Sequence, residues 1–231
     1  MRVILAEKPS VAQSIAAVLG ADQKKNGYLQ GENDIVSWCI GHLIELAPPE
    51  IYDARYAKWR REDLPIVPSA WESVVSDGTK KQFAVLKDLL NRTDVDEVVC
   101  ATDAGREGEL IFIMAFEKTG CTKPVKRLWI SSLEESAIRD GFRSLKPGTA
   151  YDALYRAALC RAQADWLVGI NGTRLYSRLY GTKLNVGRVM TPTLAMVAQR
   201  EKEIAAFQVE RFYTVQLSCG FPAQSGRIKT R

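Results

Sequence analysis

The chain has 231 residues, of which 46% are hydrophobic and 26% are charged, so it can bury a sizeable core in one or two domains. No apolar stretch reaches the roughly 20 residues that a bilayer span needs, and no signal-peptide pattern is present, which excludes a membrane protein and predicts a cytoplasmic one. The five cysteines form no C-x-x-C pair and have no regular spacing, so neither a zinc ribbon nor a disulfide framework is indicated.

Charge is unevenly distributed along the chain. Residues 151–231 hold 12 Lys and Arg against 5 Asp and Glu, a net charge of +7, whereas residues 1–150 have a net charge of −2. A basic second part joined to an acidic first part suits a polyanionic partner such as DNA. A solvated basic face without a partner would have the same composition, so both interpretations stay open.

The first forty residues predict two strands and a helix. Residues 3–5 form a short apolar strand, and residues 11–19 form an amphipathic helix that Gly20 can end. Residues 23–34 are polar and contain glycine, which is typical of a loop or hairpin. The next strand is expected over residues 35–40.

Residues 47–69 form a connector rich in proline and aromatic residues, and proline interrupts it too often for a helix. Its basic and aromatic side chains could contact nucleic acid, because bases stack on aromatic rings. The same rings could instead anchor the connector to the core. An amphipathic helix is expected next, over residues 77–91.

Strands and helices continue to alternate up to about residue 145. Residues 98–101 are β-branched and apolar, as in a buried strand of a parallel sheet, and helical character begins at Arg106. Residues 125–130 predict another strand, and residues 131–135 resemble a capping box at the start of a further helix. This alternation predicts an α/β fold with a mostly parallel sheet and helices on both faces.

The pattern changes after Lys146-Pro147-Gly148, and a mainly helical second domain is expected. Residues 151–180 contain no proline and predict one long helix, or two helices broken near Gly169–Gly172. Thr191 is a good N-cap for a later helix, with a proline at the first helical position. Residues 212–217 alternate as a strand does.

Acidic residues follow two of the predicted strands. Glu7 and Asp103 each leave the carboxyl end of a strand, and Glu107 falls in the first turn of the next helix. If the two strands are neighbours, these carboxylates converge, with Lys8 and Arg106 beside them. Such oxygen ligands suit Mg²⁺ when a substrate phosphate supplies further contacts. Asp103 alone would more often be a helix cap, but convergent acids and bases favour a functional site.

These residues carry a resemblance to a known family. The segments Glu7–Ser10 and Asp103–Glu109 resemble the Toprim domain of type IA DNA topoisomerases, especially of topoisomerase III. The family pattern is an early Glu and then Asp-x-Asp-x-Glu, and here Gly105 replaces the second Asp, which removes one candidate metal ligand. His42, the only histidine, resembles a histidine that follows the same strand in the family, although a capping or core role is equally compatible with the sequence.

The second part of the chain extends the resemblance. Segments 161–171 and 187–194 resemble the helical single-strand-binding domain of these enzymes, with Met190 where the family usually has Gln. The resemblance spans nearly the whole chain. It implies a Rossmann-like Toprim domain over residues 1–148, a helical single-stranded-DNA-binding domain over residues 149–210, and the start of a truncated domain over residues 211–231.

The resemblance also implies an activity and roles for individual residues. Enzymes of this family are ATP-independent isomerases that cleave and rejoin one DNA strand. Glu7 is then the general acid and base, Lys8 and Arg106 contact the scissile phosphate, and Mg²⁺ is held by Glu7, Asp103 and Glu107. The expected contacts to single-stranded DNA are Arg161, Arg174, Arg188 and Thr191. A monomer is expected.

The nucleophile of the family is a tyrosine in a Tyr-x-Arg-Thr-Asp context, and none of the eight tyrosines here has that context. The sequence is therefore interpreted as an N-terminal fragment that binds single strands and Mg²⁺ but does not turn over alone. A Toprim-type metal-dependent nuclease and a non-catalytic nucleic-acid-binding module are the alternatives. The two helical segments argue against the nuclease, and the intact acids argue against the non-catalytic module.

Overall fold

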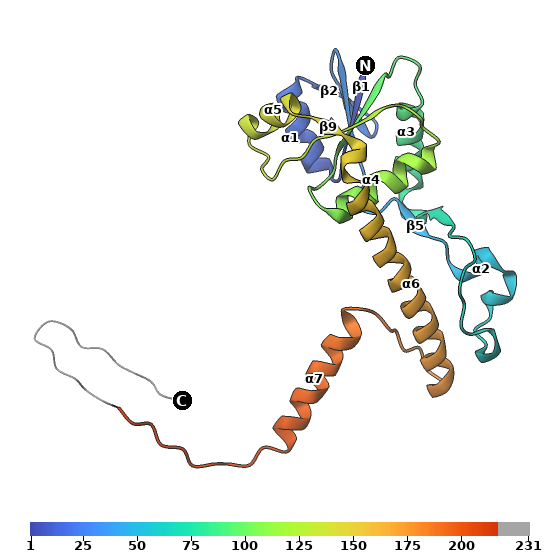
Figure 1. Ribbon diagram of the computed structural model, residues 1–231, viewed down its shortest axis with the longest axis vertical. Helices are drawn as coiled ribbons and strands as arrows, with labels where there is room; N and C mark the ends of the chain where they lie inside the picture. The colour runs from blue at the N-terminus through green and yellow to red at the C-terminus, as the bar shows by residue number, and fades with distance from the viewer. Residues whose placement is uncertain (217–231) are drawn as a thin grey trace, which may run out of the picture. The chain divides into compact units, whose positions relative to one another are not determined.

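The computed structural model describes residues 1–216, which form parts of two compact units (Figure 1). The first unit is Met1–Gly187, and the second begins at Arg188. Most of the domain predicted over residues 211–231 lies outside the described residues, and the predicted boundaries near residues 148 and 210 stay predictions. Among the helices of the described part, none is long and apolar enough to cross a membrane.

A seven-stranded, mostly parallel sheet organises the first unit. Its strand order is β2-β3-β4-β1-β7-β8-β9, in which β4, β1, β7 and β8 run parallel while both edges are antiparallel. The strands are β1 (Arg2–Ala6), β2 (Gln23–Lys25), β3 (Tyr28–Gln30), β4 (Asp34–Trp38), β7 (Glu97–Ala101), β8 (Val125–Arg127) and β9 (Lys146–Pro147). The strands predicted near residues 3–5, 35–40, 98–101 and 125–130 are confirmed, residues 23–34 form the hairpin rather than the loop, and β1 and β7 are neighbours.

Both faces of the sheet are covered by helices, which confirms the α/β fold class. Alternate residues of β1 point to opposite faces, so Val3 and Leu5 belong to one buried cluster and Ile4 and Ala6 to another. Figure 1 shows α1 and α5 on one side of the sheet and α3 and α4 on the other. These helices are α1 (Pro9–Leu19), α3 (Lys80–Leu90, after η3, Asp77–Thr79), α4 (Arg106–Thr119) and α5 (Glu135–Arg143).

The ends of two helices test the capping predictions. Helix α1 ends at Gly20, whose φ of 72° lies in the left-handed region that favours glycine, as predicted. The predicted capping box before α5 is wrong, because Glu134 occupies the N-cap position without a side-chain hydrogen bond. Instead, Ser132 Oγ accepts a hydrogen bond from the Glu134 backbone N–H at 3.2 Å, which forms a local turn and delays the start of the helix.

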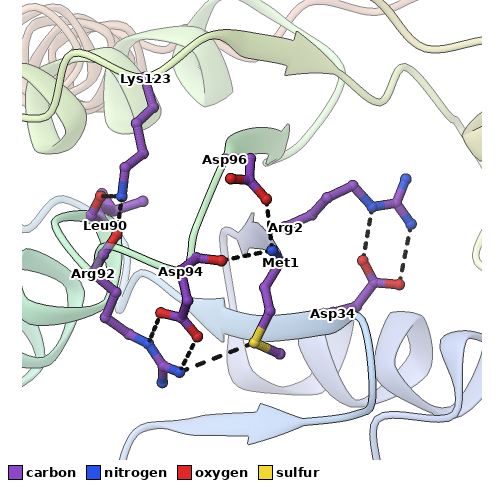
Figure 2. A network of polar contacts seen from close by, with 8 residues as sticks. All are labelled: Met1, Arg2, Asp34, Leu90, Arg92, Asp94, Asp96 and Lys123. Atoms are coloured by element: carbon purple, nitrogen blue, oxygen red, sulfur yellow. Dashed lines mark hydrogen bonds and ion pairs between the residues drawn. The ribbon is translucent and has the colours of Figure 1, made fainter.

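The amino ends of the central strands are fastened by polar contacts (Figure 2). The amino group of Met1 donates to the Asp94 carbonyl at 2.6 Å and to Asp96 Oδ2 at 2.8 Å. Arg2 of β1 binds the carboxylate of Asp34 in β4 through two hydrogen bonds of 2.8 and 3.0 Å. These contacts tie β1 to β4 and to the turn before β7. They fix the register of the strands, and with it the relative positions of their carboxyl ends.

The connector runs between the two strands of a small second sheet and is anchored by aromatic rings. Strands β5 (Ile44–Leu46) and β6 (Ser73–Val75) pair at its two ends, and between them lie only the short helices α2 (Pro49–Tyr52), η1 (Ala54–Ala57) and η2 (Arg61–Asp63). The rings of Tyr52 and Trp71 pack edge-on against Trp166, with ring centroids 5.9 and 5.4 Å away. Trp166 Nε1 also donates to the Ala47 carbonyl at 3.0 Å. These contacts support the anchoring interpretation of the rings.

Helix α6 (Asp152–Tyr180, after η4, Gly148–Tyr151) is one continuous helix of 29 residues. The alternative of a break near Gly169–Gly172 is therefore wrong. The returning chain explains the glycine, because a Cβ atom on Gly172 would lie 3.0 Å from the side chain of Val186. Glycine here permits close packing and does not end the helix.

Two polar residues of α6 hold the connector. Asn171 acts like a strand partner, because its Oδ1 accepts from the Ile66 N–H at 2.6 Å and its Nδ2 donates to the Ile66 carbonyl at 2.9 Å. Arg174 is buried, donates to the Tyr56 carbonyl at 2.7 Å and lies over the ring of Trp59 at 5.4 Å. These contacts therefore fix the position of the connector along α6.

The second unit contains helix α7 (Met190–Ala205). The prediction that Thr191 is its N-cap is wrong, because Val189 occupies that position and its carbonyl already accepts from the Thr193 N–H at 3.1 Å. The predicted strand over residues 212–217 is also wrong for residues 212–216, which pair with no strand of the described chain. Leu217 lies outside the described residues.

We expect Asn171→Ala to loosen the connector. Both backbone groups of Ile66 lose their partner, and leaving such groups unpaired costs about 1–3 kcal/mol each. Urea denaturation should show a lower free energy of unfolding, and hydrogen exchange should become faster in peptides that contain Ile66. The exposed Arg178→Ala variant on the same helix should change the free energy by less than about 0.5 kcal/mol. Equal effects of the two variants would contradict this role of Asn171.

Candidate functional site at the strand ends

The carboxyl ends of β1 and β7 bring two of the predicted acids together. Ala6 pairs with Ala101 in register, so Glu7 and Asp103 leave the sheet beside each other. The Asp103 N–H donates to Glu7 Oε2 at 3.3 Å. The neighbouring Lys8 ammonium lies 3.7 Å from Glu7 Oε1 and 3.9 Å from Asp103 Oδ2. The expected convergence of these three residues is present.

Glu107 faces a different partner. It lies in the first turn of α4, next to Arg106 at the first helical position, and its Oε2 is 3.9 Å from Nε2 of His42. His42 follows β4 and its side chain is 47% exposed, so it is neither a buried core residue nor distant from the acids. The sequence left the role of His42 open. The structure places His42 at the carboxyl ends of the parallel strands, where the acids also lie.

The positions of the three acids show which of them could bind a magnesium ion together. Within residues 1–216, no group of three or more His, Cys, Asp and Glu side chains is arranged to hold a metal. The carboxylates of Glu7 and Asp103, which both lie within 4 Å of the Lys8 ammonium, nevertheless fit Mg²⁺, which is usually bound by one or two carboxylates, water and substrate phosphates. Glu107 is separate from this pair and stays a predicted third ligand.

A buried arginine that was not predicted from the sequence supports the loop between β7 and α4, residues 102–105, which carries Asp103. Arg127, at the end of β8, is 1% exposed and donates hydrogen bonds to the carbonyls of Thr102 at 2.7 Å and Asp103 at 2.8 Å. Its Nε donates to Glu109 Oε1 at 2.5 Å. The guanidinium also reaches the Cys100 carbonyl. Arg127 therefore fixes the backbone that carries Asp103, and the signal in the sequence was an arginine and a glutamate placed inside apolar runs.

Burial raises the pKa of two groups beneath the loop. It raises the pKa of Glu109, and the charge of Arg127 opposes that rise. It also raises the pKa of the Cys100 thiol to about 11, so this thiol is neutral at ordinary pH. Cys100 is thus unsuited to act as a nucleophile, and it makes a 3.3 Å contact with Thr102 Oγ1.

Gly108 allows α4 to touch the loop directly. A Cβ atom at this position would lie 2.1 Å from the Asp103 carbonyl oxygen, far inside any possible contact. The Thr102 hydroxyl donates to the Gly108 carbonyl at 2.8 Å, which adds a hydrogen bond between the loop and the same turn of α4. The first turn of α4 and the loop therefore form one packed backbone unit.

The predicted DNA contacts are distributed over both units. Arg161 lies on α6 with its Nε 3.9 Å from Asp165, and its side chain is 38% exposed. Arg174 lies thirteen residues further along the helix, about 20 Å at 1.5 Å per residue, and is occupied by the connector. Arg188 and Thr191 belong to the second unit. Their roles, and those of Glu7, Lys8 and Arg106, stay predictions.

Comparison with known proteins identifies the family. A family model described as the Toprim domain matches residues 2–133, and one described as DNA topoisomerase matches residues 149–230. The chain belongs to the type IA DNA topoisomerases. The DNA topoisomerase 3 proteins of Bacillus anthracis and Shouchella clausii are 51% and 52% identical to it, over 93% and 94% of this chain. These matches cover 29% and 30% of the two relatives, so the chain spans less than a third of their length.

A solved structure supports the fold of this topoisomerase family member. The structure of full-length topoisomerase I from Thermotoga maritima matches 99% of this chain and 35% of its own, with a TM-score of 0.62 and 24% sequence identity. The mostly parallel sheet followed by a helical region is therefore shared with a type IA topoisomerase.

We expect Gly108→Ala to destabilise the first unit. Replacing glycine by alanine within a helix favours folding by about 1 kcal/mol, but the clash with a backbone oxygen cannot be relieved by rotating a side chain and overpacking costs about 1–3 kcal/mol. The clash should dominate, and urea denaturation measures the result. Gly105→Ala, in the same loop, is the control, since its Cβ would meet nothing within 4 Å. A variant of Gly108 as stable as the control would refute the contact.

We expect Arg127→Met to lower the free energy of unfolding by about 3–5 kcal/mol, because it leaves Glu109 as an unpaired buried charge. The double variant Arg127→Met, Glu109→Leu should recover part of this loss, which a double-mutant cycle in urea measures. Arg139→Met, which breaks the exposed pair with Glu135, should cost about 0.5 kcal/mol or less. A double variant as unstable as the sum of both single variants would contradict the pairing.

Proposed function

We propose that this chain supplies the acid site and part of the strand-binding surface of an enzyme that cleaves and rejoins one DNA strand, as a topoisomerase III does. The observation that carries the proposal is the contact of Glu7, Asp103 and Lys8 at the ends of neighbouring parallel strands in a chain of this family. Toprim-type acids next to a lysine suit phosphoryl transfer, in which positioning and charge stabilisation dominate.

The side chains divide the chemistry between them. Glu7 is 9% exposed and would hold or release the proton of the 3′-oxygen at the break, because it is the most enclosed acid of the site. Lys8 and Arg106 would neutralise the scissile phosphate. Mg²⁺ bound by Glu7 and Asp103, with Glu107 as a third ligand, would supply positive charge that orients the strand ends for resealing.

The nucleophile is proposed to come from outside this chain. Tyr176 has an arginine two residues later but lacks the Thr-Asp that follows in the family, and its ring stacks on Tyr180 with centroids 6.4 Å apart. The chain alone would then bind single-stranded DNA and Mg²⁺ without cleaving, as a monomer in the cytoplasm. Arg161, Arg188 and Thr191 are the proposed DNA contacts, whereas Arg174, which is buried and donates to the Tyr56 carbonyl, would hold the connector in place.

A chimera tests the function directly. In it, this chain replaces the matching part of the Bacillus anthracis DNA topoisomerase 3, to which it is 51% identical. The chimera should relax negatively supercoiled plasmid with Mg²⁺, and Glu7→Gln should abolish relaxation while the exposed Glu134→Gln does not. A folded chimera without activity, or one unaffected by Glu7→Gln, would refute the assignment.

The chain by itself should leave supercoiled plasmid intact while it binds a single-stranded oligonucleotide. Nicks without a protein–DNA adduct, lost in Glu7→Gln, would instead identify a metal-dependent nuclease. An adduct would show that a tyrosine of this chain is the nucleophile.

We expect Gly105→Asp to increase the affinity of the isolated chain for Mg²⁺. The substitution adds a carboxylate to the loop that carries Asp103, and affinity for hard cations rises with the number of charged oxygen ligands. Because Gly105 has an extended backbone and free space at its Cβ position, the substitution should not disturb the fold. Calorimetric titration with MgCl₂ measures the change, with Gly105→Ala as the control. Identical affinities of the two variants would place the ion elsewhere.

We expect Arg188→Ala to weaken binding of single-stranded DNA uniformly across sequences. Loss of one phosphate contact should reduce the slope of log K against log salt by slightly less than one, since about 0.7 counterions are released per phosphate of a single strand. Fluorescence anisotropy at several salt concentrations measures the slope. Arg156→Ala, an exposed arginine on α6 without a proposed role, should leave the slope unchanged. An unchanged slope in Arg188→Ala would reject the contact.

A further inference from the structure

A cavity of about 300 Å³ lies between α4, β8, η4 and the start of α6. Its walls are mainly apolar and include Phe112, Ile113, Phe116 and Val125. The rings of Phe112 and Phe116 are stacked, with centroids 5.7 Å apart and an angle of 18° between their planes. A volume of this size is at the lower end of the range for small-molecule sites, and an aromatic wall suits a compact apolar group.

The charges that line the cavity do not balance. Arg127 and Glu109 are both buried and are paired with each other at 2.5 Å, so they contribute no net charge. The other two charged residues of the lining are the acids Glu117 and Asp152. Glu117 is exposed and accepts a hydrogen bond from the Tyr155 hydroxyl, whereas Asp152 is half-buried in the first turn of α6. The lining therefore has a net negative charge and favours a cation.

Together, the aromatic wall and the acidic lining define one kind of occupant. We propose that this cavity binds a compact organic cation with an apolar body, such as an arylalkyl ammonium ion, whose body packs on Phe112 and Phe116 and whose charge lies near Glu117 and Asp152. The site is separate from the acids at the strand ends, although Arg127 contributes to both. Since the binding needs neither DNA nor Mg²⁺, its failure would leave the proposed topoisomerase function untouched.

Three ligands of one shape test the proposal on the full chain. Phenethylammonium, 2-phenylethanol and phenylacetate carry the same ring with a positive, neutral and negative group. Isothermal titration and saturation-transfer NMR should show that the cation binds at least fivefold more tightly than the alcohol, and that the anion binds least. Equal binding of all three ligands, or no binding of the cation at millimolar concentration, would overturn the proposal.

Charge-removing variants locate the site. Glu117→Gln with Asp152→Asn should weaken phenethylammonium at least fivefold and leave 2-phenylethanol unchanged, because the apolar walls are intact. Glutamine at position 117 can still accept the hydrogen bond from Tyr155, so the fold should be kept. Asp88→Asn, an exposed acid on α3 away from the lining, is the matched control. Unchanged affinity for the cation in the double variant would overturn the assignment to this cavity.

Discussion

The burial of the Arg127 charge is the constraint on which the acid site depends. A guanidinium without solvent must have its donors satisfied, and the groups that satisfy them are the carbonyls after β7, the carboxylate of Glu109 and the carbonyl of Leu128. A charge-neutral replacement would not bring these groups together. The position of Asp103 therefore depends on a side chain that is itself buried.

In the connector and α6, too, polar and aromatic side chains hold the chain itself in position. Residues that could contact a partner by their chemistry, such as Arg174 and the aromatic rings, are occupied by the chain's own backbone and side chains. Asn171 satisfies both backbone groups of Ile66, which a long irregular segment would otherwise leave to water. A proline-rich segment keeps a defined path because polar side chains of one long helix replace the missing strand partners.

The sequence allowed the sheet and the convergence of Glu7 and Asp103 to be predicted, since short apolar runs ending in acids are typical of parallel strands. It did not reveal the pairing of Glu107 with His42, which depends on β4 lying next to β1. The starts of α5 and α7 were placed wrongly because Ser132 and Thr191 suit an N-cap by residue type, while the hydrogen bonds of the surrounding backbone decide which residue occupies it. Arg127 was missed because a charged residue in a strand gives no periodic signal.

The contact between Gly108 and Asp103 has a consequence for motion at the site. Because the backbone of α4 rests directly on the carbonyl of Asp103, and the hydroxyl of Thr102 bonds to the same turn, the loop has no slack in which to swing on its own. Any displacement of Asp103 must carry the amino end of α4, and Glu107 with it. The loop is thus a rigid extension of the helix, and Asp103 and Glu107 keep a fixed spacing whenever this end of α4 is displaced.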